Sequence, residues 1–187
     1  MINNAATQKM SWMSAKEVNI LITPWKKRWT IPNPQVRDAA DQFDGARLLL
    51  DKQPSPSGVL SPLLNNAAIA LELYLKCLGA VSVYTPAPGS VVSRVTAKPL
   101  ICHGLIDLLE EIPQDIRESL ESEYAAAHTN RALRGDRRQY EGLFTASRYP
   151  FEKSKDISKY RLRCLMDLCS FLGDFTANMK EIDRIEQ

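Results

Sequence analysis

The segment from Ser61 to Ala80, SPLLNNAAIALELYLKCLGA, is apolar on nearly every side. A helix of this composition is buried all round, so the segment predicts the central helix of a mainly helical domain. Ser61 suits the N-cap and Pro62 the first helical position, which predicts where the helix begins. Gly79 predicts where it ends, because glycine commonly follows the last turn of a helix.

Three polar residues of this segment, Asn65, Glu72 and Lys76, fall on one narrow stripe. Steps of seven and four residues return to nearly the same helical angle. Glu72 and Lys76 also have the i,i+4 order that favours an ion pair. Charged side chains on a buried helix are either paired in the core or part of a functional site. The stripe is therefore the first candidate site.

Apolar residues that recur every three or four positions predict further helices on both sides of the central one. The expected ranges are 34–52, 103–112, 113–128, a short helix within 129–155, and 156–184. Two β-rich runs around a Pro/Gly turn at 81–99 predict either a hairpin or a flexible insertion. Residues 1–33 are expected to form an irregular arm with a short strand at 18–22. The patterns thus predict an all-α domain over 34–187.

The bulk composition is that of a globular protein of 187 residues, with 44% hydrophobic and 25% charged residues and a net charge of +2. A chain of this length usually forms one domain. No segment reaches the roughly 18 apolar residues that a membrane span needs, and the first residues lack the apolar core of a signal peptide. A cytoplasmic location with no membrane partner is therefore expected.

The four cysteines, Cys77, Cys102, Cys164 and Cys169, lack the CxxC spacing of zinc sites. They are expected to be free thiols that pack as small hydrophobic residues, and neither a metal site nor a cofactor is predicted. The GxSxG, Walker, GxGxxG and HExxH motifs are also missing from the sequence. Their absence argues against the common hydrolase, kinase, dehydrogenase and metalloprotease chemistries.

Charge is divided along the chain. Residues 104–127 hold seven acids and one base, a net charge of −6, whereas residues 131–163 hold ten bases and four acids, a net charge of +6. Three interpretations stay open: the basic segment steers a polyanion to one face, it pairs two subunits, or the two segments neutralise each other within one chain.

The last predicted helix is longer than a small core needs. At 1.5 Å per residue, the range 156–184 would span roughly 40 Å. Its apolar stripe continues throughout, so part of the stripe is expected to pack on a second copy of the protein. The sequence therefore predicts a homodimer through the C-terminal helix.

Few residues are suited to chemistry. The chain has two histidines, His103 at the start of a predicted helix and His128 in a polar stretch that is typical of the surface. Arg148 and Tyr149 precede the last helix. If these elements pack together, Glu72, Lys76, His103 and Arg148 meet in one polar pocket. Such a cluster is either an anion site or a structural network.

Four phrases in order resemble the HEPN superfamily. They are ALELYLKCL at 70–78, HGLIDLLEEIP at 103–113, SRYPFE at 147–152, and a long closing helix. Specifically, the chain looks like the branch whose helices read LELYLKxL, then a GHDL-type turn, then RYP. The resemblance covers about 60–182, with 34–52 as the family's first helix. Gly104 stands where the family usually has an acid.

The resemblance implies an antiparallel bundle of four or five helices, usually a homodimer. It also implies a prokaryotic or phage setting, often near defence or toxin–antitoxin functions. Many HEPN proteins are metal-independent RNases whose motif is an arginine, four to six residues, then a histidine. This chain departs from that motif: eight residues separate Arg94 from His103, and ten separate Arg117 from His128.

The residues that match the family's polar positions are Glu72, Lys76, His103, Arg148 and Tyr149. The favoured interpretation is a protein that binds RNA or a nucleotide-type anion. Lys76 and Arg148 would hold phosphate, His103 would donate a hydrogen bond, and Glu72 would orient Lys76.

Two alternatives remain open at this point. One is a catalytically silent interaction module in which the same residues form a core network. The other is a divergent RNase with His103 as general acid and base and Arg148 stabilising the transition state. Whether the protein is an enzyme is not decided by its sequence.

Overall fold

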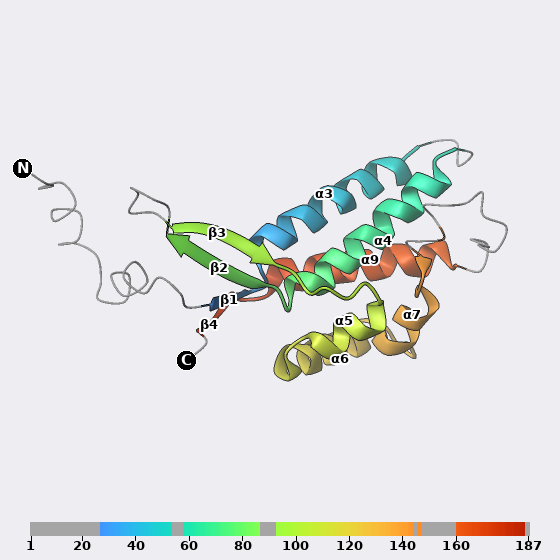
Figure 1. The fold of residues 1–187 in the computed structure, drawn as a ribbon. Helices are drawn as coiled ribbons and strands as arrows, with labels where there is room; N and C mark the ends of the chain where they lie inside the picture. The colour runs from blue at the N-terminus through green and yellow to red at the C-terminus, as the bar shows by residue number, and fades with distance from the viewer. Residues whose placement is uncertain (1–26, 54–57, 87–92, 144–145, 147–159, 186–187) are drawn as a thin grey trace, which may run out of the picture.

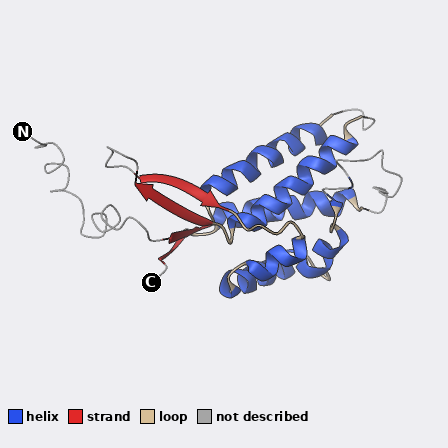
Figure 2. Cartoon of the chain, viewed as in Figure 1, coloured by secondary structure: helices blue, strands red, loops and turns tan. Residues whose placement is uncertain are grey.

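The computed structural model describes residues 27–53, 58–86, 93–143, 146 and 160–185, which are mainly helical with one small sheet (Figures 1 and 2). The helices are α3 (Pro34–Asp51), α4 (Leu60–Cys77), α5 (Leu105–Glu111), α6 (Gln114–Ala127), α7 (Leu133–Gln139) and α9 (Leu162–Asn178). The strands are β1 (Lys27–Ile31), β2 (Val81–Pro86), β3 (Ser93–Lys98) and β4 (Ile182–Ile185). None of the described helices has the length and apolarity that crossing a membrane requires.

Helices α3, α4 and α9 lie side by side, and α5, α6 and α7 lie along one side of them (Figure 1). α4 is the central element, as its composition predicts, and it buries residues on opposite sides, including Ala68 and Cys77. α9 turns one apolar face to it, with Leu168 and Leu172 fully buried. This packing makes one continuous core.

The start of α3 is fixed by Asn33. Its side-chain oxygen accepts a hydrogen bond from the Val36 amide at 3.3 Å, and Pro34 occupies the first helical position. The Asn33 amide donates to the Cys77 carbonyl at 2.7 Å, and its side-chain nitrogen donates to Ser82 at 3.0 Å. Asn33 therefore joins the start of α3 to the end of α4 and to β2.

The four strands form one antiparallel sheet in the order β3-β2-β1-β4 (Figure 2). The hairpin interpretation of 81–99 is confirmed, since β2 and β3 pair from Val81↔Lys98 to Pro86↔Ser93. The all-α fold class is right for the helical majority of the described chain, but the sheet extends beyond this hairpin. β1 pairs with β4 from Arg28↔Ile185 to Ile31↔Ile182. β1 also pairs with β2, so it connects β4 to the hairpin.

Two boundaries of the arm and the last helix need correction. The arm was expected to be irregular to residue 33, yet Lys27–Ile31 is a strand; the strand expected at 18–22 lies outside the described residues. The last helix was expected to reach 184, but α9 ends at Asn178. Ile182 fits the helical stripe in sequence, but the unpaired side of β1 offers backbone hydrogen bonds that a continued helix would leave unused.

Two helix starts also differ. The last helix was expected to start at residue 156, but α9 begins at Leu162 with Arg161 as its N-cap. α4 begins at Leu60, one residue before the predicted cap Ser61, and its N-cap is Val59 with no side-chain hydrogen bond. The predictions for α3 and α6 hold to within one or two residues, and the short helix expected within 129–155 is α7. All four cysteines are free thiols, of which Cys77 and Cys169 are buried, and burial raises the pKa of both.

Candidate functional site

Glu72 on α4 is the centre of the candidate site. Its Oε1 lies 2.8 Å from Nζ of Lys76 and 2.9 Å from Nδ1 of His103. The ion pair with Lys76 is the one that the i,i+4 spacing predicts. His103 comes from the segment before α5, 31 residues further along the chain. The structure thus brings together three of the five residues that the sequence singled out.

The three side chains differ greatly in exposure. Those of Lys76 and Glu72 are 7% and 13% exposed, whereas that of His103 is 75% exposed. A carboxylate that is paired with an ammonium only accepts hydrogen bonds, so Nδ1 of His103 carries the proton of this contact. Glu72 therefore holds the imidazole by one nitrogen, and Nε2 stays available to a ligand.

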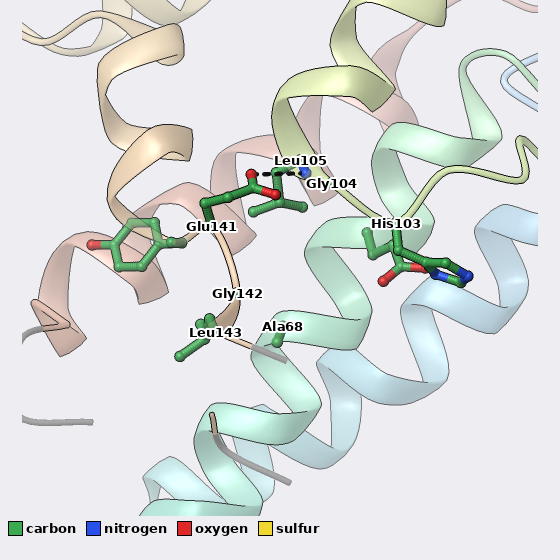
Figure 3. Close-up of a pocket in the computed structure, with 9 residues that line it drawn as sticks. Ala68, His103, Gly104, Leu105, Glu141, Gly142 and Leu143 are labelled. Atoms are coloured by element: carbon green, nitrogen blue, oxygen red, sulfur yellow. Dashed lines mark hydrogen bonds and ion pairs between the residues drawn. The ribbon is translucent and has the colours of Figure 1, made fainter. Parts of the chain in front are cut away.

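A pocket of about 180 Å³ lies beside this contact, between α4, the start of α5 and the end of α7 (Figure 3). In Figure 3, His103 and Glu141 stand on opposite sides of the hollow, with Ala68 and Gly142 between them. The described residues that line it are Ala68, Glu72, His103, Gly104, Leu105, Tyr140, Glu141, Gly142 and Leu143. The pocket is formed within one chain.

Glu141 and Arg137 both hydrogen-bond to the backbone of Leu105, two residues after His103. Oε2 of Glu141 accepts a hydrogen bond from the Leu105 amide at 3.1 Å, and the Arg137 guanidinium donates to the Leu105 carbonyl. Arg137 is 1% exposed, and burial lowers its pKa to about 10. Its Nε has no hydrogen-bond partner among the described residues. The loop before α5 is thus anchored from α7 and from the turn after it.

The space around Gly104 favours glycine at this position. A Cβ there would lie 2.9 Å from Oδ2 of Asp107 and 3.0 Å from Oε1 of Glu141. Any side chain would push against both carboxylates. An acidic residue at this position would add a third carboxylate to the same corner.

The other predicted site residues are placed as follows. Lys76 does not line the pocket; its side chain is 7% exposed and its ammonium neutralises Glu72. The contact of Glu72 with Lys76 is the expected one, but the phosphate-binding role expected of Lys76 has no support from the lining of the pocket. Arg148 and Tyr149 lie outside the described residues. Glu141 and Gly142 line the pocket but were not predicted, since only the fold brings this turn to Gly104.

The basic segment is partly neutralised within the chain. Nε of Arg131 lies 2.9 Å from Asp136, and Arg134 contacts Glu110 at 2.7 Å and Glu121 at 2.9 Å. The last two pairs join the acidic and basic segments directly, which favours the self-neutralising interpretation for these side chains.

Three other arginines, at positions 138, 161 and 163, remain exposed. The side chains of Arg138, Arg161 and Arg163 have no ion pair to other described residues. The backbone of Arg161 is linked to a pocket residue, since the Tyr140 hydroxyl donates to the Arg161 carbonyl at 2.9 Å.

His128 is not a surface histidine, contrary to expectation. It is half-buried, its ring stacks on Tyr124 at 4.2 Å between centroids, and it meets the edge of Phe171 at 5.7 Å. Its Nδ1 also lies 3.2 Å from the Tyr124 carbonyl. His128 therefore packs between α6 and α9, and of the two histidines only His103 is open to a ligand.

No cluster of three or more His, Cys, Asp or Glu side chains in the described part of the chain has the arrangement to hold a metal ion. A scan against protein-family models, a search of curated proteins and a search of solved structures found no match.

Proposed function

We propose that this protein binds RNA through the pocket between His103 and Glu141, with His103 as a ligand-facing group. The observation that carries the proposal is the contact of His103 with Glu72. The carboxylate of Glu72, which is 13% exposed and paired with Lys76, fixes one nitrogen of an exposed imidazole whose residue lines the pocket. Fixed groups of this kind bind with little loss of side-chain entropy.

Phosphate contacts come from outside the pocket in this proposal. Lys76 is buried and paired with Glu72, so it does not bind phosphate. In this proposal the phosphates are bound by Arg138, Arg161 and Arg163, whose side chains are exposed. Arg148, which the family resemblance places at the site, would add to them. Arginine binds phosphate in a fork of parallel hydrogen bonds, and such contacts make binding weaken as the salt concentration rises.

The wider setting belongs to the same proposal and rests on the order of the phrases at 70–78, 103–113 and 147–152. It comprises a HEPN-like antiparallel bundle, a homodimer through the C-terminal helix, and a cytoplasmic role in prokaryotic or phage defence. The dimer is tested by light scattering after gel filtration. A mass of twice 21.0 kDa supports it, and a mass of 21.0 kDa removes it.

A direct test of RNA binding uses fluorescence anisotropy with labelled total RNA and tRNA fragments, without added metal. The parent protein is expected to bind with an affinity that falls steeply between low and moderate salt. His103→Ala is expected to weaken binding on the order of tenfold, since it removes one fixed hydrogen-bonding group. His128→Ala is the matched control. Equal affinities of the parent and His103→Ala would remove His103 from the site.

A divergent, metal-independent RNase is the second candidate function. The tautomer that Glu72 imposes leaves Nε2 of His103 unprotonated in the neutral ring, which is the form a general base needs. The same RNA samples, run on a denaturing gel, test it. Cleavage by the parent that His103→Ala abolishes would make the protein an RNase. Intact RNA in both lanes would leave a binding protein.

A further inference from the structure

The pocket beside His103 is lined by acids and has no described cation. Glu72 and Glu141 both line it, whereas Lys76, which pairs with Glu72 at 2.8 Å, does not. Asp107 lies close to the same corner, because its Oδ2 would be 2.9 Å from a Cβ on Gly104. Because Lys76 neutralises Glu72, the unpaired carboxylate of the described wall is that of Glu141; it repels a phosphate and accepts hydrogen bonds, so whatever enters here presents hydrogen-bond donors.

One acceptor in the pocket is free for such a donor. Oε2 of Glu141 is occupied by the Leu105 amide at 3.1 Å, while Oε1 has no hydrogen bond to another described residue. Figure 3 shows the Glu141 carboxylate at the edge of the hollow beside Gly104 and Leu105. The bond to Leu105 fixes the direction of the carboxylate, so Oε1 is preorganised for a ligand.

The size of the pocket matches a single aromatic ring. Its volume is about 180 Å³, and a cavity of roughly 150 Å³ is known to hold benzene. A whole nucleotide does not fit, whereas one pyrimidine base does. Nothing in the described part of the chain lies within 4 Å of an added Cβ on Gly142, so the absence of a side chain there lets such a ring approach the backbone.

We infer that this pocket takes a cytosine base of the bound RNA, with Glu141 accepting a hydrogen bond from its exocyclic amino group. The inference rests on the RNA-binding function proposed above. Carboxylate side chains read cytosine by this N4 contact. Uracil presents a carbonyl oxygen at the same position, which faces Oε1 as acceptor against acceptor. The acid-lined pocket thus supplies selectivity, while the exposed arginines outside it supply affinity.

The test uses two labelled RNA oligomers of about 12 nucleotides, oligo(C) and oligo(U), with anisotropy at neutral pH. The parent protein is expected to bind oligo(C) on the order of tenfold more tightly than oligo(U). Glu141→Gln keeps the carbonyl oxygen that accepts from Leu105 and replaces the other oxygen with an amide NH₂. That NH₂ donates to uracil, so Glu141→Gln is expected to reverse the preference.

Glu123→Gln is the matched control, because Glu123 is exposed on α6 and bonds only Ser119 among the described residues. It removes the same charge, so both variants gain equally in general affinity for a polyanion. A melting curve first checks that Glu141→Gln is folded.

Equal binding of oligo(C) and oligo(U) by the parent would overturn the inference and leave RNA binding intact. The same would follow if Glu141→Gln and Glu123→Gln changed both affinities alike. If no RNA of any kind binds the parent, the proposed function itself fails, which is a separate result from a lost base preference.

Discussion

Nδ1 of His103 lies 2.9 Å from Oε1 of Glu72, so an exposed ring on the α5 side is held by a nearly buried carboxylate of the central helix. The same oxygen takes the ammonium of Lys76 at 2.8 Å. Glu72 therefore has two roles: it neutralises a buried cation, and it orients the one exposed histidine. Substitutions of Glu72 and His103 should therefore affect stability differently.

Glu72→Ala should cost stability, and His103→Ala should not. Removing Glu72 leaves Lys76 unpaired at 7% exposure, which is expected to lower the free energy of unfolding by about 3 kcal/mol. The His103 side chain is 75% exposed, so its removal is expected to change stability by less than about 0.5 kcal/mol. Urea denaturation measures both. A Glu72→Ala variant as stable as the parent would mean that Lys76 reaches solvent.

Two glycines within helices should respond to alanine in opposite directions. Gly45 in α3 has nothing within 4 Å of an added Cβ, so Gly45→Ala is expected to raise stability by roughly 1 kcal/mol through helix propensity. A Cβ on Gly173 in α9 would lie 3.1 Å from the Tyr74 hydroxyl, which is held by Asp41 at 2.9 Å. Gly173→Ala is therefore expected to destabilise the protein.

Thermal melting compares these two glycine variants under one set of conditions. If Gly173→Ala melts above the parent, α4 and α9 have room to move apart.

Stability should fall at alkaline pH. Burial raises the pKa of Tyr74, Tyr124 and Tyr140 above the usual 10.0, and hydrogen bonds to Asp41 and Asp136 raise the first two further. As the pH rises through 10.0, the unfolded chain loses these phenolic protons while the folded chain keeps them. The unfolded state then binds fewer protons, so unfolding becomes more favourable.

Arg137 changes stability with pH in the opposite direction from the three tyrosines, but it is a single group. Burial lowers its pKa from 12.5 to about 10, so between these values the folded state is the one that has lost a proton. Three tyrosines outweigh one arginine. A titration followed by phenolate absorbance is expected to show these hydroxyls ionising only together with loss of helical circular dichroism. Their smooth ionisation near pH 10 in a folded protein would contradict their burial.

The helices could be predicted because their signals are local. Pro34 and the period that starts at Val36 predict a helix over 34–52, and α3 covers Pro34–Asp51. A 3.6-residue period and a first-turn proline depend on neighbouring residues alone, so no knowledge of the fold is needed.

The sheet could be predicted only where its strands are neighbours in sequence. β2 and β3 follow each other and were recognised as a pair, but β1 and β4 come from opposite ends of the chain. Ile182 continues the apolar stripe of α9 in sequence and yet pairs with Ile31 in the structure. Tertiary hydrogen bonding decides between helix and strand at such a position.

The candidate site divides in the same way. The Glu72–Lys76 pair follows from spacing on one helix, and His103 stands out as one of two histidines, at the start of a predicted helix. Glu141 was missed, because its role depends on the Leu105 amide, 36 residues away in sequence. In the sequence it is only an acid within a basic segment, and nothing marks it as the wall of a pocket.

The most direct test of the central claim is an NMR titration of the imidazole nitrogens with RNA. The chain has two histidines, so a spectrum of His103→Ala assigns both rings. The account predicts that His103 is protonated at Nδ1 in its neutral form and that its Nε2 signal shifts saturably with RNA. The His128 signals should stay in place, because that ring is stacked on Tyr124. A His103 ring that does not change at saturating RNA, while the protein binds it, would contradict the claim that this pocket is the RNA site.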